Sequence, residues 1–379
     1  MERAELRALL RATGCAVERG EFIFLCDPNL SAAERANVDA QLAHGEDATG
    51  GAERGWIGIR TGGSSGAVKF ARHDEHTLSA AVRGLCAHFG FTRVNAIDVL
   101  PAFHVSGLMT RVRCAATGGR RVAWDWKRLE AGQVPEISDS EWVLSLVPTQ
   151  LQRLMELPAQ VAWLRRLKII FVGGGPVWPE LANAAAAAEL RVALSYGLTE
   201  TAAMVAALRP EEFLAGARSA GTVMPHARLE IDRGENVVTI EGESVFRGYW
   251  PELRAGRRFV TDDLARIDER GHVHILGRRD AVIITGGKKV HPADVEAALR
   301  ASGEFSDVAV VGVPDREWGE IVVACYPRAA SRVPDLTRAV AGLAAHQRPK
   351  RFVPVDDWPR NAQGKLNRAA LRRAISDKL

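Results

Sequence analysis

The chain of 379 residues is long enough for a large domain and a smaller one, on the usual scale of about 100–200 residues per domain. Its hydrophobic content of 47% and charged content of 25% are ordinary for a globular protein and exclude a disordered chain. The net charge is only +4, and the arginines are dispersed among acids, so nucleic acid is not an expected partner.

The cysteines and the N-terminus predict an untargeted protein in a reducing, cytoplasmic setting. The five cysteines are odd in number and form no CxxC pair, which argues against a disulfide framework or a zinc site. Glu2 and Glu5 stand where a signal peptide would be basic, and no apolar run approaches the roughly 18 residues of a membrane span. We therefore expect no membrane insertion. A homo-oligomer is compatible with the sequence, which specifies no oligomeric state.

Short apolar runs alternate with helical patterns through the first two thirds of the chain, which predicts a parallel sheet covered by helices. The expected strands are residues 56–60, 95–100, 142–147, 167–172 and 191–195. The expected helices include the pattern Leu78, Val82, Leu85 and Phe89 and the alanine-rich residues 181–190. From about Ala227 the pattern becomes β-rich, with expected strands at 228–231, 237–241 and 272–276.

A charged stretch, Gly277-Arg278-Arg279-Asp280, follows the last of these strands and is the candidate hinge. Beyond it the pattern is compact α+β, with a helix starting at Pro292, strands at 308–313 and 321–326, and a terminal helix at 368–375. The sequence therefore predicts an α/β fold with an N-terminal domain of residues 1–277 and a small α+β domain of residues 278–379.

The loop Thr-Gly-Gly-Ser-Ser-Gly-Ala-Val-Lys at residues 61–69 follows an expected strand. Its glycines allow backbone N–H groups to curl around phosphate oxygens, and its hydroxyls and lysine add donors. It is not a Walker A loop, because Gly-Lys-Ser/Thr is missing at the required spacing. A flexible surface turn explains the composition equally well.

The segment Ser-Tyr-Gly-Leu-Thr-Glu-Thr at residues 195–201 combines an aromatic ring with a carboxylate. The ring could flank a nucleotide base, and the carboxylate of Glu200 could hold Mg²⁺ against phosphate. Alternatively, the segment is an ordinary turn from a strand into a helix, with Thr199 as the cap.

Two further charged segments could serve a nucleotide. Thr-Asp-Asp-Leu at 261–264 offers a carboxylate for ribose hydroxyls, and the guanidinium groups of 277–280 suit phosphate or ribose. Asn-Ala-Gln-Gly-Lys-Leu at 361–366 ends in a lysine that could enter a cleft. Each segment on its own is also explained as a solvated charged turn.

Together and in this order, these segments resemble the adenylate-forming superfamily, which comprises acyl-CoA synthetases, adenylation domains of peptide synthetases, and luciferases. The resemblance runs from about Trp56 to the end of the chain. It implies an adenylate-forming enzyme fold, with a large N-terminal α/β domain, a hinge at Arg279 and Asp280, and a mobile C-terminal domain that rotates between two half-reactions. Only 60 residues precede Thr61, which implies a shortened first subdomain.

The resemblance also implies roles for individual residues and requires ATP, Mg²⁺ and coenzyme A. The ATP phosphates would be held by Thr61, Gly62, Gly63, Ser64, Ser65, Gly66 and Lys69. Further nucleotide contacts would come from Ser195, Tyr196, Gly197, Thr199, Asp263 and Arg278, with Glu200 as the magnesium ligand. Lys365 would be the adenylation catalyst, because a fixed cation lowers the barrier when two anions must approach each other.

The acid and the thiol acceptor would occupy a second group of residues. By resemblance, His104 gates the acyl pocket and the glycine turn at 173–175 lines it. An isolated histidine in an apolar stretch is otherwise explained as a packed core residue. The acyl and coenzyme A contacts would be made by His104, Ser106, Gly173, Gly174, Gly175, Gly286, Gly287 and Lys288.

Within the superfamily, Phe-His-Val-Ser-Gly at 103–107, the hinge segment, and Ile-Thr-Gly-Gly at 284–287 resemble the o-succinylbenzoate–CoA ligase branch of menaquinone biosynthesis. The implied substrates are small molecules, namely the acid, ATP and coenzyme A. Three alternatives stay open: another aryl- or acyl-CoA ligase, a stand-alone adenylation enzyme that loads a carrier protein, and a non-catalytic nucleotide sensor.

Two histidine pairs, His73 with His76 and His272 with His274, raise the question of a metal site. Neither pair has a convincing third and fourth ligand in the sequence. Exposed polar faces are the preferred explanation for both.

Overall fold

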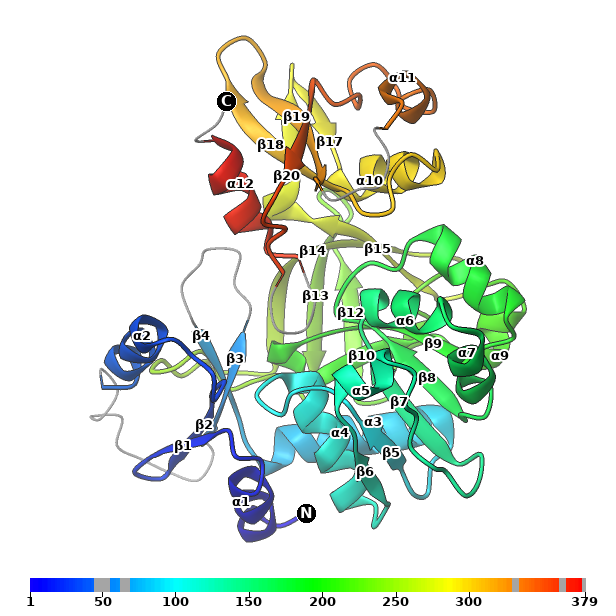
Figure 1. Cartoon of the computed structure of the whole chain (residues 1–379). Helices are drawn as coiled ribbons and strands as arrows, with labels where there is room; N and C mark the ends of the chain where they lie inside the picture. The colour runs from blue at the N-terminus through cyan, green and yellow to red at the C-terminus, as the bar shows by residue number, and fades with distance from the viewer. Residues whose placement is uncertain (44–54, 62–68, 329–333, 361–365, 377–379) are drawn as a thin grey trace.

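A computed structural model of the chain describes residues 1–43, 55–61, 69–328, 334–360 and 366–376 (Figure 1). Their strands form four sheets, with strand orders β1-β2-β3-β4, β11-β10-β9-β8-β7-β5-β6, β12-β13-β14-β15 and β17-β16-β19-β18, and β20 pairs with β19. The fold is α/β, as predicted. The last sheet lies apart from the other three, at the top of Figure 1.

The first sheet is small and was not predicted as a separate unit. It contains β1 (Ala16–Arg19), β2 (Phe22–Leu25), β3 (Ile57–Thr61) and β4 (Lys69–His73), accompanied by the helices α1 (Arg3–Arg11) and α2 (Ala32–Ala43). The strand expected at 56–60 is present, but its inclusion in the large parallel sheet is wrong. It pairs with β2 and β4 instead, and Thr61 lies opposite Lys69 in the antiparallel register.

The second sheet is the parallel sheet that the sequence predicted. Its strands are β5 (Asn95–Asp98), β6 (Arg121–Ala123), β7 (Trp142–Leu146), β8 (Ile169–Val172), β9 (Val192–Leu198), β10 (Ala203–Ala207) and β11 (Thr222–Val223). The strands from β6 to β9 are parallel, whereas β10 and β11 are antiparallel additions. Residues of β5 and β8 are buried throughout, as expected for strands covered by helices on both faces.

Helices surround this sheet and supply much of its core. They are α3 (Glu75–Phe89), α4 (Val105–Ala116), α5 (Trp126–Glu130), α6 (Pro148–Met155), α7 (Pro158–Leu164), α8 (Pro179–Ala187) and α9 (Pro210–Leu214). The predicted helical patterns therefore correspond to α3 and α8. Asp74 caps α3 by accepting the backbone N–H of Thr77 at 2.8 Å, and Gly90 ends the helix in the left-handed conformation.

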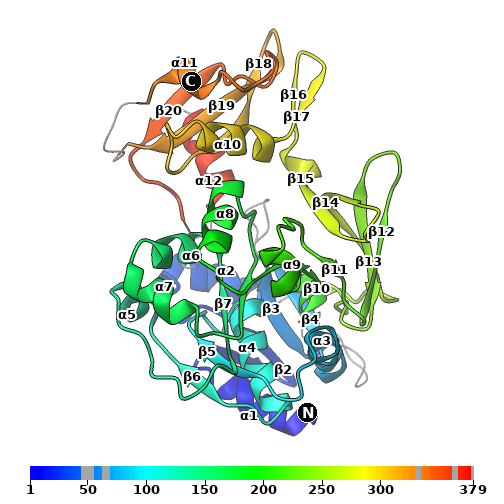
Figure 2. The same ribbon diagram turned by 90° about the vertical axis from the view of Figure 1, so that its right-hand side faces the viewer.

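The third sheet is an antiparallel meander of β12 (Ala227–Ile231), β13 (Val237–Gly242), β14 (Arg258–Ile267) and β15 (Val273–Arg278). Figure 2 shows it projecting to one side of the helical layers. The segment 261–264, expected as a charged turn, lies within β14, because that strand continues for ten residues. Thr261 and Asp263 are therefore buried on one face of the strand, whereas Asp262 between them is exposed.

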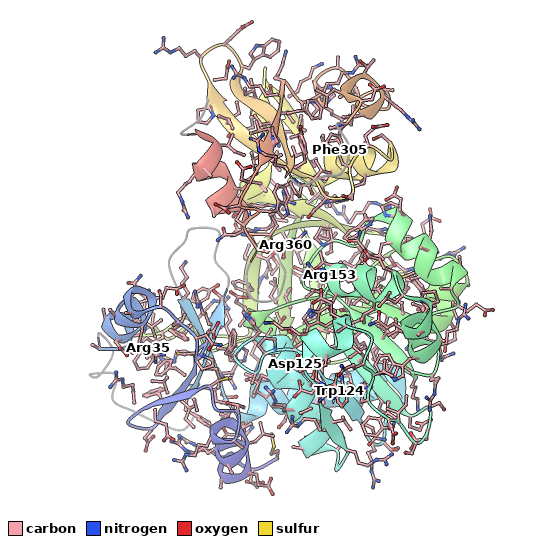
Figure 3. All side chains as sticks on the ribbon, viewed as in Figure 1. Arg35, Trp124, Asp125, Arg153, Phe305 and Arg360 are labelled. Atoms are coloured by element: carbon pink, nitrogen blue, oxygen red, sulfur yellow. The ribbon has the colours of Figure 1, made fainter. Side chains whose placement is uncertain are left out.

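The last sheet follows the candidate hinge. A short 3₁₀ helix, η2 (Arg279–Ala281), leads to β16 (Ile283–Thr285), β17 (Lys288–Val290), β18 (Ala309–Asp315), β19 (Gly319–Pro327) and β20 (Arg351–Val355). The accompanying helices are α10 (Pro292–Ala301), α11 (Leu336–Ala339) and α12 (Arg368–Ser376). Phe305, which is labelled in Figure 3, packs against the rings of Tyr326 and Phe352 in the core of this sheet. The elements predicted from residue 292 onward are present.

No helix in the part of the chain that the structure describes combines the length and apolar character needed to cross a membrane.

Candidate functional site

Asp263 is a buried carboxylate at the junction of two elements that the sequence singled out. It lies on β14 directly opposite Arg278 of β15, and the residue is only 6% exposed. The hydroxyl of Tyr196 donates to Oδ2 of Asp263 at 2.8 Å. The backbone N–H of Asp263 donates to Oγ1 of Thr261 at 3.0 Å, which fixes the strand locally. The predicted ribose carboxylate is therefore held in one orientation.

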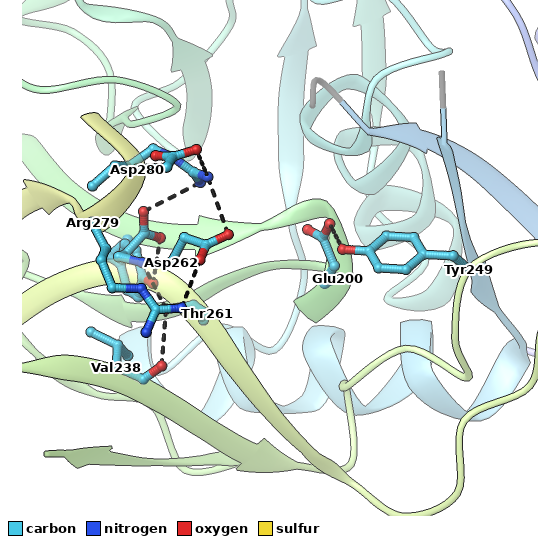
Figure 4. A network of polar contacts seen from close by, with 10 residues as sticks. Glu200, Val238, Tyr249, Thr261, Asp262, Arg279 and Asp280 are labelled. Atoms are coloured by element: carbon cyan, nitrogen blue, oxygen red, sulfur yellow. Dashed lines mark hydrogen bonds and ion pairs between the residues drawn. The ribbon is translucent and has the colours of Figure 1, made fainter. Parts of the chain in front are cut away.

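Arg278 connects Asp263 to the candidate hinge. Its Nε donates to Oδ1 of Asp280 at 2.8 Å, and its terminal nitrogens lie 3.7 Å from Asp263 and 3.4 Å from Asp262. Arg279 reaches Oδ1 of Asp262 at 3.1 Å (Figure 4). The hydrogen bond to Asp280, together with the charges of the three aspartates, raises the pKa of Arg278. The guanidinium is thus a permanent cation within an acidic cluster.

Tyr196 belongs to β9, which is longer than predicted and reaches Leu198. The strand does not lead into an α-helix, as the alternative interpretation supposed, but through the 3₁₀ turn η1 (Thr199–Thr201) into antiparallel β10. A Cβ at Gly197 would lie 1.9 Å from the carbonyl oxygen of Ala203, so only glycine allows this pairing. Burial and the Asp263 charge raise the pKa of Tyr196, which keeps its hydroxyl protonated as a donor.

Glu200 lies in η1, half-buried, at the edge where the large sheet ends. Its backbone oxygen accepts the N–H of Phe246 at 2.8 Å. The hydroxyl of Tyr249 donates to Oε1 of the Glu200 carboxylate at 2.7 Å (Figure 4). Burial raises the pKa of Glu200, and the Tyr249 hydrogen bond opposes that shift. Both Asp263 and Arg278 also act on its charge, so the two candidate groups belong to one electrostatic environment.

The strand β4 ties the predicted phosphate loop to Glu200. Nε2 of His73 lies 2.8 Å from the carbonyl oxygen of Thr199, the residue before Glu200. Nζ of Lys69 lies 5.3 Å from the centre of the Tyr249 ring, a cation–π distance. Thr61 and Lys69 thus flank the loop beside Glu200, whereas Gly62, Gly63, Ser64, Ser65 and Gly66 lie outside the described residues.

The glycine turn after β8 meets the same edge of the sheet. Gly174 has φ +76°, and a Cβ at Gly173 would lie 2.6 Å from Oγ of Ser195. Oγ of Ser195 donates to the carbonyl oxygen of Val172 at 3.2 Å. Gly173 and Ser195 are therefore neighbours. Gly175 follows in the same turn, which leads to α8.

His104 stands at the N-cap position of α4, and Ser106 lies in the first turn of that helix. The His104 ring is half-buried and lies 4.5 Å from the ring of Phe103. His104 is therefore packed on one side and not fully buried in the core. Its role toward an acid stays a prediction.

The remaining predicted residues lie beyond β15. Arg279 and Asp280 form η2, and Gly286 and Gly287, at φ +54° and +74°, make the tight turn between β16 and β17. Lys288 is exposed at the start of β17. Lys365 lies outside the described residues. Its described flanks are joined by a β-bridge between Arg360 and Leu366 and by the Asn367 N–H, which donates to the carbonyl oxygen of Pro359 at 2.8 Å.

The described residues contain no group of three His, Cys, Asp or Glu side chains that could hold a metal by itself. Mg²⁺ usually takes one or two carboxylates and completes its shell with water and substrate phosphates, so the single carboxylate of Glu200 fits a nucleotide-bound ion. The histidine pairs have other partners: His272 and His274 face Glu212 and Asp268. The explanation as exposed polar faces is wrong for His73, which ends β4 and is 0% exposed, and for His272, which is 7% exposed.

Sequence reasoning missed Tyr249 and the bridging role of His73. Tyr249 is 49 residues from Glu200 along the chain, and His73 is 126 residues from Thr199. No local pattern connects such distant residues. The presence of one of the chain's three tyrosines in the segment Arg-Gly-Tyr-Trp was the only available signal.

Two family models match the chain. The model described as AMP-binding enzyme matches residues 34–250, and the model of the AMP-binding enzyme C-terminal domain matches residues 294–365. A 2-succinylbenzoate–CoA ligase of Geobacillus kaustophilus is 32% identical over 74% of this chain, which spans 61% of that relative's length. An indoleacetate–CoA ligase of Aromatoleum aromaticum is 30% identical over 84% of this chain and 67% of its own length.

Solved structures share the fold. ATP-bound MatB from Rhodopseudomonas palustris has a TM-score of 0.73 and 28% identity, over 87% of this chain and 70% of that chain. The o-succinylbenzoate CoA synthetase MenE from Bacillus subtilis, in complex with the acyl-adenylate intermediate OSB-AMP, has a TM-score of 0.72 over 84% of this chain and 69% of its own. At 24% identity, this second likeness bears on the fold alone. The predicted adenylate-forming fold is confirmed.

Proposed function

The chain belongs to the AMP-binding enzyme family, and we propose that it activates a carboxylic acid with ATP and transfers the acyl group to coenzyme A. The observation that carries this proposal is the link between two carboxylates: Asp263, which is 6% exposed, accepts the hydroxyl of Tyr196, and Tyr196 lies on the segment β9–η1 that also carries the half-buried Glu200. Tyr249 and Tyr196 each donate a hydroxyl to one of them. Carboxylates kept in place at this cost of desolvation are typical of binding sites.

Each charged group has a task in adenylation. Asp263 would accept hydrogen bonds from the ribose hydroxyls, with Arg278 beside it, and Lys69 would form ion pairs with phosphate oxygens. Lys365 would hold the acid and the α-phosphate together, so that the acid oxygen displaces pyrophosphate without uncompensated anionic repulsion. Glu200 would be the protein ligand of Mg²⁺, which neutralises polyphosphate charge when bound. His104, Ser106 and Gly173 would line the acid's side of the site.

We further propose that residues 278–379 move as one domain about Arg279 and Asp280. The 3₁₀ turn η2 between β15 and β16 supports this hinge, because short irregular connections absorb backbone rotation. The exposed Lys288, beside the Gly286-Gly287 turn, would then meet coenzyme A, which carries phosphates.

For the acid we propose o-succinylbenzoate, which would place the enzyme in the cytoplasm, in menaquinone biosynthesis. The proposal is supported by the likeness to several 2-succinylbenzoate–CoA ligases, at 27–32% identity. A second candidate is an arylacetic acid, favoured by the 30% identity with an indoleacetate–CoA ligase. The remaining alternatives are a separate carrier protein in place of coenzyme A and a non-catalytic nucleotide sensor.

Pyrophosphate release over a panel of acids, each with and without coenzyme A, tests these proposals. We expect release with o-succinylbenzoate and formation of its thioester, AMP and pyrophosphate when coenzyme A is present. The panel includes indoleacetate and benzoate as competitors. No release with any acid would sink the enzymatic function, and release without a thioester would favour carrier loading. A higher kcat/KM for indoleacetate would replace the proposed acid.

A further inference from the structure

Tyr249 lies between two groups of opposite charge. Its hydroxyl donates to Oε1 of Glu200 at 2.7 Å, while the Lys69 ammonium stands 5.3 Å from its ring centre. One side chain therefore contacts a carboxylate through its polar tip and a cation through its ring. What this arrangement does deepens the function proposed above and rests on it.

The backbone on both sides of Tyr249 fixes the position of its ring. Tyr249 forms a β-bridge with Ala71, and the N–H of Trp250 donates to the carbonyl oxygen of Phe70 at 2.9 Å. The ring of Phe246 packs edge-on against the Tyr249 ring at 4.8 Å between centres. The tyrosine is thus tied to β4, the strand that begins with Lys69, and its placement does not depend on its hydroxyl alone.

The two charges contact different parts of the Tyr249 side chain, Lys69 over the ring and Glu200 at the hydroxyl. In the part of the chain that the structure describes, no ion pair joins Lys69 to Glu200, although Tyr249 contacts both. A direct pair would neutralise both groups and would have to be broken before either could bind a nucleotide. The hydrogen bond from Tyr249 occupies only one of the roughly four lone-pair sites of the Glu200 carboxylate, so a cation can still bind.

We propose that Tyr249 is a positioning residue that orients Glu200 for Mg²⁺ and keeps Lys69 from pairing with it, so that both groups stay available to Mg²⁺-bound ATP. Its hydroxyl orients the carboxylate, and its ring prevents the ion pair. The two contributions are separable by substitution. Tyr249→Phe removes the hydroxyl and keeps the ring, whereas Tyr249→Leu removes both.

Binding of Mn²⁺ measures these effects without turnover. Mn²⁺ is a suitable probe because it binds the same carboxylate and phosphate oxygens as Mg²⁺. Mn²⁺ affinity is measured by electron paramagnetic resonance on the full chain with a non-hydrolysable ATP analogue. We expect Tyr249→Phe to weaken Mn²⁺ binding about tenfold, the usual effect of losing a ligand's hydrogen-bond partner. Tyr326→Phe is the matched control, because it removes a half-buried tyrosine hydroxyl from β19 and should leave Mn²⁺ affinity unchanged.

The leucine variant tests the separation of charges. Tyr249→Leu should weaken Mn²⁺ binding more than Tyr249→Phe does, because Lys69 can then pair with Glu200. Adding Lys69→Met to Tyr249→Leu should return Mn²⁺ affinity to about the level of Tyr249→Phe, a non-additive effect. A thermal melt of each variant checks the fold, and Tyr249→Phe carries the test if the leucine variant does not fold.

The results separate this proposal from the function on which it rests. Wild-type protein that binds no Mn²⁺ with the analogue, and releases no pyrophosphate with any acid, would refute the proposed function. If wild-type protein binds Mn²⁺ tightly and the Tyr249→Phe variant has the same Mn²⁺ affinity, only the role of the hydroxyl would be overturned. Failure of Lys69→Met to restore affinity in the leucine variant would overturn the role of the ring.

Discussion

Replacement of Asp263 by asparagine tests the nucleotide site directly, because it removes a charge and almost no volume. Asparagine keeps one acceptor oxygen for the Tyr196 hydroxyl, which now lies at 2.8 Å. Arg278 keeps its hydrogen bond to Asp280 at 2.8 Å, and its contact with Asp263 is a longer 3.7 Å. We therefore expect the free energy of unfolding to fall by less than about 2 kcal/mol, within the common range for single substitutions.

The effect on ATP should be larger than the effect on stability. The NH₂ group of asparagine replaces one carboxylate oxygen and cannot accept a hydrogen bond from a ribose hydroxyl at that position. A hydrogen bond to a charged group contributes about 1.5–3 kcal/mol, and about 1.4 kcal/mol corresponds to a tenfold change in Kd. The Asp263→Asn variant should therefore bind ATP roughly 10- to 100-fold more weakly.

Calorimetric titration with ATP, together with urea unfolding, measures both quantities. Asp262→Asn is the matched control, because Asp262 neighbours Asp263 on β14 but its side chain is 49% exposed. We expect this control to bind ATP within about threefold of wild type, since exposed ion pairs contribute little. Wild-type ATP affinity in Asp263→Asn, or a greater loss in Asp262→Asn, would refute the assignment of the ribose carboxylate.

Three further substitutions test other parts of the molecule. Lys365→Ala should abolish pyrophosphate release but spare thioester formation from a supplied acyl-adenylate, and equal loss of both steps would contradict the two-conformation mechanism. Asp74→Asn should lower the urea unfolding free energy at pH 7 by about 3 kcal/mol, because it breaks a buried pair with Arg247 at 2.7 Å. Burial alone would raise the pKa of Asp74, but the Arg247 hydrogen bond holds that pKa below its ordinary value. The ionised Asp74 therefore stabilises the folded state above about pH 4. The difference in unfolding free energy between the variant and wild type should shrink as the pH falls toward about 3. Gly197→Ala should lower the melting temperature and pyrophosphate release together, because its Cβ would meet the carbonyl oxygen of Ala203 at 1.9 Å; unchanged melting would contradict the β9–β10 pairing.

Local physical chemistry explains which elements could be predicted. Pro292 begins α10 because its ring fixes a backbone angle that suits the first helical turn, and because a backbone N–H at this position would have no partner within the helix. Gly286 and Gly287 form a tight turn because both adopt the left-handed conformation that favours glycine. The all-apolar segment of β8 reads as a buried strand for the same kind of local reason. These features depend on neighbouring residues, so the sequence carries them.

Partner choice between distant segments could not be predicted in this way. The strand β3 has the same apolar character as β5, yet it joins a different sheet because it pairs with β2 and β4. The sequence predicts a charged turn at Asp263 because two adjacent aspartates are typical of turns. Only the pairing of β14 with β13 and β15 identifies Asp263 as a buried strand residue. The residue types of the candidate site were readable, but their mutual contacts were not.

Arg278 gives the proposed hinge a physical connection to the proposed nucleotide site. Its Nε donates to Asp280 at 2.8 Å, and a terminal nitrogen of the same guanidinium lies 3.7 Å from Asp263. Asp280 lies in η2, where we propose that the backbone rotates, whereas Asp263 is fixed on β14 by its neighbours. Rotation about η2 would therefore alter the competition between two carboxylates for one guanidinium. A bound ribose, by engaging Asp263, would shift the same competition toward Asp280, so nucleotide occupancy and hinge position are expected to influence each other reciprocally.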